Sequence, residues 1–322
     1  RYYFMRDVIL NFPNQIKEGV RVAGDFKMEK KYDKIVICGM GGSAIPGMIY
    51  LTWQEHQNKG PGVPIIINNT YGLPSDVLAN DLVICISWSG ATDETTSALE
   101  SAINKKIDSI VITNPIHPED KLAQLAQQNN IKTFVIPYEN IPPRFAVGHM
   151  TAVLFTILGL KSHLEVELLS KEQEGVGKDL ADKIGDKIPL LYSSYSWRKL
   201  GALWKANFNE TSKVPAYWNY FPAMAHDELE MYVRPNLPFY PIIFKDKNDN
   251  PKHVRDLDIA IAILNKQEYN DSIIELNSFG TPSETILNNY ILGLWTSYYL
   301  AKKLSIDPID IKLIEEFKSL KK

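Results

Sequence analysis

Short apolar segments alternate with amphipathic ones along the first half of the chain. Five apolar runs are rich in β-branched residues and too short to form helices; they cover residues 34–38, 64–68, 82–87, 109–113 and 132–137. The intervening segments 92–103 and 118–129 are compatible with helices. Strands that are apolar on both faces and alternate with helices are typical of a doubly wound, mainly parallel sheet. We therefore predict an α/β fold for this half.

The second half repeats the alternation after a helical region. Residues 145–160 predict a buried helix, and residues 166–187, which are mixed in charge, predict an exposed one. Strands and helices are expected to follow: strands at 188–193, 241–244 and 272–276, helices at 197–208, 256–266, 282–303 and 308–320. We expect two α/β units, an N-terminal one over residues 1–150 and a C-terminal one over 151–322.

Composition limits the partners of this protein. The 322 residues are 45% hydrophobic, which is enough for a substantial core, and the net charge is −3. No block of Lys or Arg exceeds a few residues, so nucleic acid is not expected as a partner. The longest apolar stretch, 145–160, is shorter than the roughly 20 residues of a bilayer span. With no signal peptide recognised, we expect a soluble cytoplasmic protein without a membrane partner.

Cysteines, histidines and aromatic residues give no separate site. Cys38 and Cys85 sit in strand-like apolar runs and are expected to be buried free thiols, although a disulfide stays open. No Cys/His cluster has zinc-ligand spacing, so no metal is predicted. Five histidines match no motif and are expected to be structural or on the surface: His56, His117, His149, His163 and His253. Four aromatic residues favour packing or an interface over base stacking: Tyr217, Trp218, Tyr220 and Phe221.

Two turns from strand to helix carry most of the chemical information. Residues 35–47 read IVICGMGGSAIPG, and residues 82–96 read LVICISWSGATDETT. Each begins as an apolar strand, breaks into Gly and Ser, and then enters a helix. A helix N-terminus presents unpaired N–H groups and a positive dipole end, which suit a phosphate. In a doubly wound sheet, ligands bind outside the carboxyl ends of the strands, where both turns lie.

The first turn fits a loose dinucleotide pattern, G-x-G-x-x-A. A dinucleotide site also needs an acid at the end of the next strand, and residues 68–70 are Asn, Asn and Thr. We therefore expect Ser43 to donate its hydroxyl to an anion. The alternative, that Gly and Ser only make a tight turn and cap a helix, stays open.

The second turn is richer in hydroxyl groups. Ser87, Ser89 and Thr92 can point into one concavity, and Gly90 frees the backbone between them. The alternative is that Ser89 or Thr92 only caps the helix, and the acids at 93 and 94 favour it because they already satisfy the helix dipole. The two turns together indicate a site for a small phosphorylated molecule.

Several segments resemble those of one enzyme family. The run SWSGATDET resembles the phosphate loop of sugar isomerase (SIS) domains, and GMGGSA resembles the first SIS turn. Three later segments resemble motifs of the bifunctional phosphoglucose/phosphomannose isomerases: 142–146 (PPRFA), 209–216 (NETSKVPA) and 225–229 (AHDEL). The resemblance covers residues 35 to 320 and implies two SIS subdomains. It also implies interconversion of glucose 6-phosphate, and of mannose 6-phosphate, with fructose 6-phosphate by a homodimer that needs no metal or cofactor.

The resemblance implies a role for each catalytic residue. Glu210 would carry a proton between C2 and C1, and Arg144 would stabilise the enediolate charge. His226, contributed across the dimer interface, would open the sugar ring. Lys303 would assist ring opening, and its neighbour Lys302 stays open as an alternative.

The same resemblance implies a set of substrate-binding residues. Six residues would hold the substrate: Gly42, Ser43, Ser87, Ser89, Thr92 and Thr296, the last linked to acceptance of both C2 epimers. The chain departs from the family pattern at Ala44, Pro46 and Ala91, which touch the phosphate turns, and at Asp227, beside the proposed ring-opening histidine.

Three other classes of protein share some of these sequence features. A non-catalytic SIS protein that senses sugar phosphates would keep the hydroxyl turns but could lose Glu210, Arg144 and His226, all of which are present. An amidotransferase making glucosamine 6-phosphate would need a glutaminase domain with an N-terminal Cys, which this sequence lacks. A dinucleotide-dependent oxidoreductase would need the missing acid described above.

Overall fold

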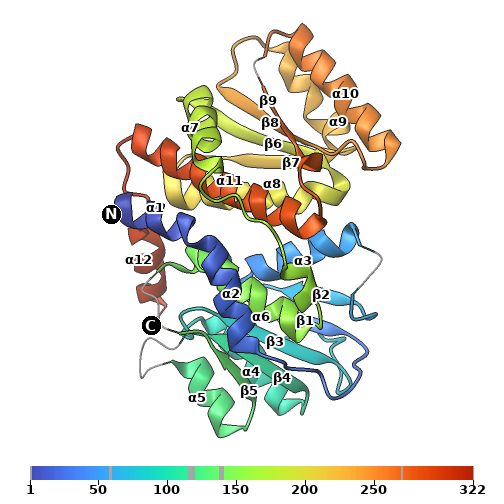
Figure 1. The fold of residues 1–322 in the computed structure, drawn as a ribbon, viewed down its shortest axis with the longest axis vertical. Helices are drawn as coiled ribbons and strands as arrows, with labels where there is room; N and C mark the ends of the chain where they lie inside the picture. Colours follow the sequence, from blue (N-terminus) through green and yellow to red (C-terminus); the bar gives the residue numbers. More distant parts are fainter. Residues whose placement is uncertain (1, 58–59, 115–119, 138–140, 270, 322) are drawn as a thin grey trace. The chain divides into compact units, whose positions relative to one another are not determined.

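The computed structural model describes residues 2–57, 60–114, 120–137, 141–269 and 271–321, which form two compact units (Figure 1). The N-terminal unit comprises Phe12–Val166, and the C-terminal unit comprises Arg1–Asn11 with Glu167–Lys322. The dividing point therefore differs from the expected 150/151. Helix α6 (Val147–Ile157), which begins just before that point, is fully buried and packs on other helices of the N-terminal unit.

The N-terminal unit is built on a five-stranded parallel sheet in the order β2-β1-β3-β4-β5. Its strands are β1 (Ile35–Cys38), β2 (Ile65–Asn68), β3 (Leu82–Ser87), β4 (Asp108–Thr113) and β5 (Lys132–Val135). Besides α6, its helices are α2 (Phe12–Ala23), α3 (Ile45–Glu55), α4 (Asp93–Asn104) and α5 (Lys121–Gln128). The predicted strands are confirmed, with ends that differ by at most two residues.

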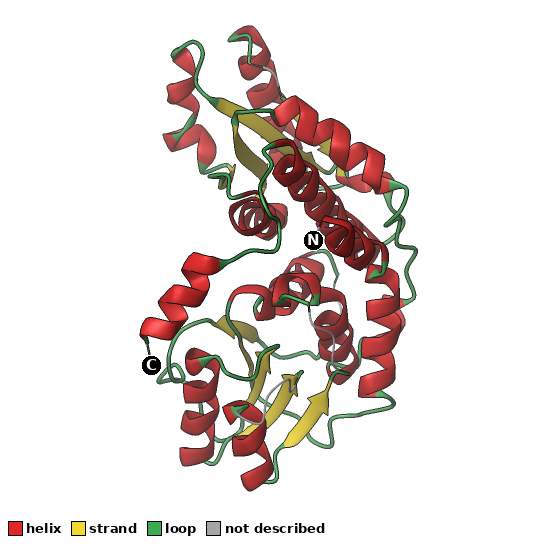
Figure 2. Cartoon of the chain, turned by 90° about the vertical axis from the view of Figure 1, so that its left-hand side faces the viewer, coloured by secondary structure: helices red, strands yellow, loops and turns green. Residues whose placement is uncertain are grey.

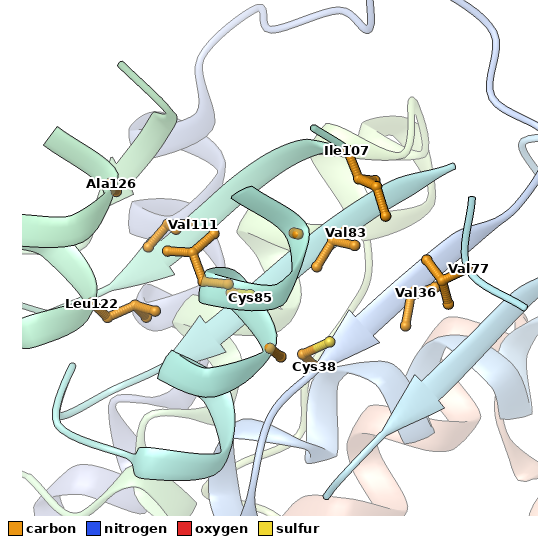
Figure 3. Packing of buried hydrophobic residues seen from close by; sticks show 12 residues of the cluster. Val36, Cys38, Val77, Val83, Cys85, Ile107, Val111, Leu122 and Ala126 are labelled. Atoms are coloured by element: carbon orange, nitrogen blue, oxygen red, sulfur yellow. The ribbon is translucent and has the colours of Figure 1, made fainter. Parts of the chain in front are cut away.

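The two cysteines lie in the core between this sheet and its helices (Figure 3). Cys38 on β1 and Cys85 on β3 face each other in register, and both are buried free thiols, as predicted. A hydrogen bond with Cys38, together with burial, raises the pKa of the Cys85 thiol. Small and branched side chains of β1, β3 and β4, such as Val36, Val83 and Val111, pack with them on this side of the sheet.

The C-terminal unit holds a second parallel sheet, in the order β7-β6-β8-β9. Its strands are β6 (Ile188–Ser194), β7 (Tyr217–Phe221), β8 (Phe239–Lys245) and β9 (Ser272–Glu275). Its helices are α1 (Tyr2–Leu10), α7 (Gln173–Ile184), α8 (Arg198–Asn207), α9 (Met224–Asp227), α10 (Pro251–Lys266), α11 (Pro282–Lys303) and α12 (Lys312–Leu320). In both units helices flank the strands, as Figure 2 shows, so the predicted α/β class is confirmed.

Helix α11 begins where its sequence dictates. Thr281 accepts a hydrogen bond from the backbone N–H of Glu284, whose carboxylate in turn accepts from the N–H of Thr281. Pro282 takes the first helical position, where a missing N–H costs nothing. The predicted bounds of this helix are confirmed.

Two expectations for the second half need correction. Helix α7 is not simply exposed, since Gly177 packs so closely on α11 that a Cβ there would lie 2.4 Å from the Cβ of Trp295. The aromatic segment 217–221, to which no strand was assigned, forms the edge strand β7. Its exposed aromatic residues hide the alternation that marks a half-buried strand. His117 and the expected start of a helix at Pro118 lie outside the described residues.

Among the helices of the described ranges, none has the length and apolar character needed to cross a bilayer. In the same part of the chain, no three or more His, Cys, Asp or Glu side chains gather into a group that could hold a metal ion.

Candidate active site

The two Gly/Ser turns meet at the switch point of the first sheet. The chain passes from β1 to β2 on one side and then returns to β3 on the other, so that the carboxyl ends of β1 and β3 lie side by side. Connections that diverge in this way open a crevice above the sheet, which is where open α/β sheets bind ligands. The sequence therefore places its hydroxyl-rich turns at the preferred ligand position of the fold.

Ser43 joins the first turn to the second. It ends a 3₁₀ turn, Gly41–Ser43, and its Oγ accepts a hydrogen bond of 3.0 Å from the backbone N–H of Trp88. The following helix, α3, has no side-chain cap, so Ser43 is not a capping residue. Within the described residues no acceptor takes the proton of the Ser43 hydroxyl, which leaves that proton to donate to a ligand.

The second turn also leaves its helix uncapped. Thr92 is the N-cap residue of α4, but its hydroxyl accepts from the Oγ of Ser87 at 3.1 Å and makes no capping bond. The Oγ of Ser89 accepts from the N–H of Ala91 at 3.4 Å. The capping alternative is therefore not supported for either residue. Although acidic side chains lie in the first turn of α4, no side-chain oxygen caps its first N–H groups, and free N–H groups at a helix N-terminus suit an anion.

Gly90 is required by the geometry of this turn. Its φ of +64° is in the left-handed region, and a Cβ there would lie about 2 Å from the carboxylate of Asp120. That carboxylate is itself fixed, because it caps α5 through the N–H of Ala123 and accepts from the hydroxyl of Thr113. A side chain at position 90 would push the turn away from the sheet.

Trp88 fixes the second turn, and sequence reasoning did not assign it a role. Its N–H donates to Ser43, its carbonyl accepts from the N–H of Asn114, and its indole N–H donates to the carbonyl of Ile141. The ring is buried and stacks on His149. Its position between Ser87 and Ser89 could have indicated a role in the turn. Its hydrogen-bond partners could not be predicted, because they lie in three distant segments.

Arg144 is brought to the first turn by close backbone contact. It lies in a 3₁₀ turn, Pro143–Phe145, and a Cβ on Gly42 would come within 2.5 Å of the Arg144 nitrogen. Gln15 of α2 holds the same segment, since its amide donates to the carbonyl of Phe145 at 2.7 Å and accepts from the N–H of Gly148. Nothing in the sequence pointed to Gln15.

The Arg144 side chain is buried, with 3% of the residue exposed. Its guanidinium lies 4.5 Å from the centre of the Phe145 ring. A guanidinium stays protonated even when buried. The N-terminal unit thus brings together Gly42, Ser43, the second turn and the backbone of Arg144, whose side chain carries a permanent positive charge.

Glu210 lies on a turn of π-helix that extends α8, residues Phe208–Ser212. Such turns are rare and occur often at functional sites. The segment is held on both sides, because the amide of Asn209 donates to the carbonyl of Val214 and the amine of Lys213 donates to the carbonyl of Glu210. Asn209 and Lys213 belong to the same NETSK segment as Glu210. The motif therefore encodes both the carboxylate and the hydrogen bonds that hold the backbone of its turn.

His226 lies on the short helix α9, directly after β7, and its side chain is exposed. Glu210 precedes β7, whereas His226 follows it, so the two residues lie at opposite ends of the second sheet. A strand of five residues spans about 16 Å. A single chain therefore does not bring His226 beside Glu210.

Thr296 and Lys303 lie on α11, and each has a partner in this unit. Thr296 is fully buried and donates its hydroxyl to the carbonyl of Leu292. The Lys303 amine forms an exposed ion pair of 3.1 Å with Asp182. Lys302 lies over the ring of Tyr299.

Helix α11 also supports the Glu210 turn. The hydroxyl of Ser212 donates to the carbonyl of Ser297 at 2.8 Å, and the Lys213 amine donates to the carbonyl of Asp307, just beyond the helix. Asp182, the partner of Lys303, lies near the end of α7, which leads into the amino end of β6. Glu210 and Lys303 therefore lie at the same end of the second sheet, and His226 lies at the other.

His149 is a structural residue, as the sequence suggested. It lies on α6 with no exposed surface and stacks on Trp88 at 5.9 Å between ring centres. Burial lowers its pKa to about 4, although the carboxylate of Glu18, 3.7 Å away, opposes this shift. The folded protein therefore keeps a neutral imidazole where the unfolded chain takes up a proton.

We expect His149 to make the protein sensitive to acid. Its folded pKa is below the unfolded value of about 6.5, so the stabilisation is complete above pH 6.5 and is lost as the pH falls toward 4. Between pH 7.5 and 5 the loss should be about 2 kcal/mol. Urea unfolding at both pH values measures it, and in a His149→Gln variant the difference should shrink by that amount. An unchanged difference in the variant would contradict this origin.

Fold and site together define the class of protein. Two parallel sheets, with hydroxyl-rich turns at the switch point of the first, are the architecture of SIS-type phosphosugar proteins. A hypothetical protein from Thermus thermophilus shares this fold, with a TM-score of 0.77 at 14% identity over 98% of this chain and 89% of that one. The tagatose-6-phosphate ketose/aldose isomerase from Escherichia coli has a TM-score of 0.69 at 15% identity, over 94% of each chain.

Sequence comparison identifies the family. Residues 173–320 match the family model of the bacterial phospho-glucose isomerase C-terminal SIS domain. A bifunctional phosphoglucose/phosphomannose isomerase from Aquifex aeolicus is 33% identical over 299 residues, which are 89% of this chain and 90% of that protein. The chain therefore belongs to the family of bifunctional phosphoglucose/phosphomannose isomerases.

Proposed function

We propose that this protein interconverts glucose 6-phosphate and mannose 6-phosphate with fructose 6-phosphate by moving a proton between C1 and C2. The observation that carries the proposal is the pair of hydroxyl turns joined by Ser43, which leave the N-terminus of α4 uncapped. A phosphate dianion suits this position because uncapped N–H groups and free hydroxyl protons both donate to it. Membership of the isomerase family favours turnover over a role in sensing alone.

Each catalytic assignment has its own support. Glu210 takes the role of the base because it is the carboxylate of the π-helical turn, whose backbone is held by the bonds of Asn209 and Lys213. Arg144 takes the role of the cation that stabilises the enediolate, since its buried guanidinium remains charged throughout the reaction. Lys303 would have to leave its exposed pair with Asp182 to act, and such a pair is worth little.

We also propose that the protein works as a homodimer in which His226 serves the partner's active site. The support is the separation of His226 from Glu210 by the length of β7, together with the exposure of the His226 side chain. Ring opening is a proton transfer to and from the ring oxygen and the anomeric hydroxyl, so an imidazole must reach them directly. An exposed histidine on one chain can do so for another.

Rates on the two aldose substrates test the proposed activity. We expect turnover of both glucose 6-phosphate and mannose 6-phosphate to fructose 6-phosphate, with unchanged rates when a chelator such as EDTA is added. The reason is that Arg144 stabilises the negative charge of the enediolate and the phosphate turns bind the phosphate, so neither charge needs a metal ion. Coupled assays with each sugar give the rates. Binding of fructose 6-phosphate without turnover would instead select the sensing role, and loss of activity in chelator would contradict the metal-free mechanism.

Mixed dimers test the shared site. A Glu210→Gln variant and a His226→Ala variant, each of which retains only a small residual activity alone, are mixed in equal amounts and allowed to exchange subunits. If His226 acts on the partner, half the dimers become heterodimers with one intact site, and about a quarter of parental activity should return. If both residues act within one chain, no site is intact and no activity returns. Subunit exchange is verified separately with differently tagged chains.

A further inference from the structure

The turn that carries His226 is anchored on both sides. Met224, two residues before the histidine, is fully buried in the core that contains Tyr192 and Phe221. Glu228, two residues after it, points its carboxylate at the second sheet. Between these anchors, residues 225–227 are exposed, so the imidazole has no packing of its own to fix its position.

Both carboxylate oxygens of Glu228 are held by neighbouring strands. The hydroxyl of Tyr192 on β6 donates to Oε2 at 2.9 Å, and the amide of Asn219 on β7 donates to Oε1 at 2.9 Å. The Asn219 amide also lies 3.3 Å from Oδ1 of Asp227, and its own oxygen accepts from the N–H of Tyr220. Two charge-assisted bonds from two strands fix one carboxylate more firmly than either bond alone.

The donors behind these bonds are themselves fixed. Tyr192 is buried, and its hydroxyl lies 2.9 Å from that of Tyr232, which is also buried. Burial raises the pKa of both tyrosines, so the hydroxyl of Tyr192 keeps its proton and remains a donor. Backbone bonds complete the turn, because the N–H of Glu228 donates to the carbonyl of Met224.

We propose that Glu228 is a positioning residue that fixes the His226 turn through its clamp by Tyr192 and Asn219. This inference rests on the ring-opening role proposed for His226. It gives a function to the glutamate of the AHDEL segment, which takes no part in the proposed proton transfers. The substrate contact is left to the imidazole, and the carboxylate acts only through it.

Kinetics on fructose 6-phosphate test the inference. Glu228→Ala and Tyr192→Phe should each lower kcat about tenfold with little change in KM, because the histidine loses its orientation. Glu228→Gln should recover most of the loss, since its oxygen still accepts from Asn219 and its amide can donate to Tyr192. Tyr240→Phe is the matched control: it is another buried tyrosine of the same sheet, but its hydroxyl bonds to Ser272 and the carbonyl of Asp271.

A double variant separates positioning from a general structural effect. If Glu228 acts through His226, then Glu228→Ala should cause no further loss of kcat in a His226→Ala protein. A tenfold loss that persists in that background, or an equal loss in Tyr240→Phe, would overturn the inference while leaving the role of His226 intact. Parental turnover in His226→Ala alone would overturn the proposed role of the histidine and this inference with it. Thermal melting of each variant shows that the compared proteins are folded.

Discussion

Replacing Glu210 by Gln should lower kcat for fructose 6-phosphate by about a thousandfold, with little change in KM. The amide keeps the shape of the side chain and the fold of its π-helical turn, but it cannot accept the proton from the sugar carbon. The phosphate turns are unaffected, since they belong to the N-terminal unit. Steady-state rates in a coupled assay give both parameters.

A control variant isolates the effect of this carboxylate. Glu315→Gln removes a negative charge from an exposed position on α12 of the same unit and should leave kcat unchanged. Glu210→Asp keeps the charge but withdraws it by one methylene, so its rate should fall between those of the parent and Glu210→Gln. Near-parental turnover in Glu210→Gln would show that another group is the base.

Replacing Gly42 by Ala should lower kcat/KM by about a hundredfold and destabilise the fold by about 1–3 kcal/mol. The added Cβ would lie 2.5 Å from the Arg144 nitrogen and 2.6 Å from the carbonyl carbon of Pro143. Both are backbone atoms and cannot rotate away, so the segment that carries Arg144 must move. The guanidinium then leaves the position in which it stabilises the enediolate. Enzyme kinetics and urea unfolding measure the two effects.

The neighbouring Gly41 provides the matched control. Its φ of +51° makes Ala strained there, but a Cβ at this position has no atom within 4 Å. Gly41→Ala should therefore cost about 1 kcal/mol of stability and retain most of the activity. If the two variants lose activity equally, the close contact between Gly42 and the Arg144 segment is not the cause of the lost activity.

The sequence was sufficient to predict the parallel architecture and the position of the two Gly/Ser turns. Strands β1 and β3 are apolar on both faces for most of their length, and a segment rich in Gly and Ser lies at the carboxyl end of each. Both signals are local, so they do not depend on the rest of the fold. The same holds for α11, whose Thr281, Pro282 and Glu284 mark its start within four residues.

The supports of the site could not be predicted, because they come from distant segments. Gln15 holds the Arg144 segment from a helix about 130 residues away. Trp88 is fixed by Ile141, 53 residues later. Such contacts depend on the folded arrangement and leave no local pattern. The separation of Glu210 from His226 within one chain has no local pattern either: only the family resemblance implied it, because it follows from β7, where the sequence analysis assigned no strand.

The most direct test of the account is the fate of the substrate proton in deuterated water. Proton transfer through Glu210 exposes the proton to solvent, so glucose 6-phosphate formed from fructose 6-phosphate should carry deuterium at C2, as proton NMR can show. The Glu210→Gln variant should lose this incorporation together with turnover. Parental turnover in the Glu210→Gln variant, with deuterium still entering at C2, would mean that another group moves the proton, and the central role of the carboxylate would be contradicted.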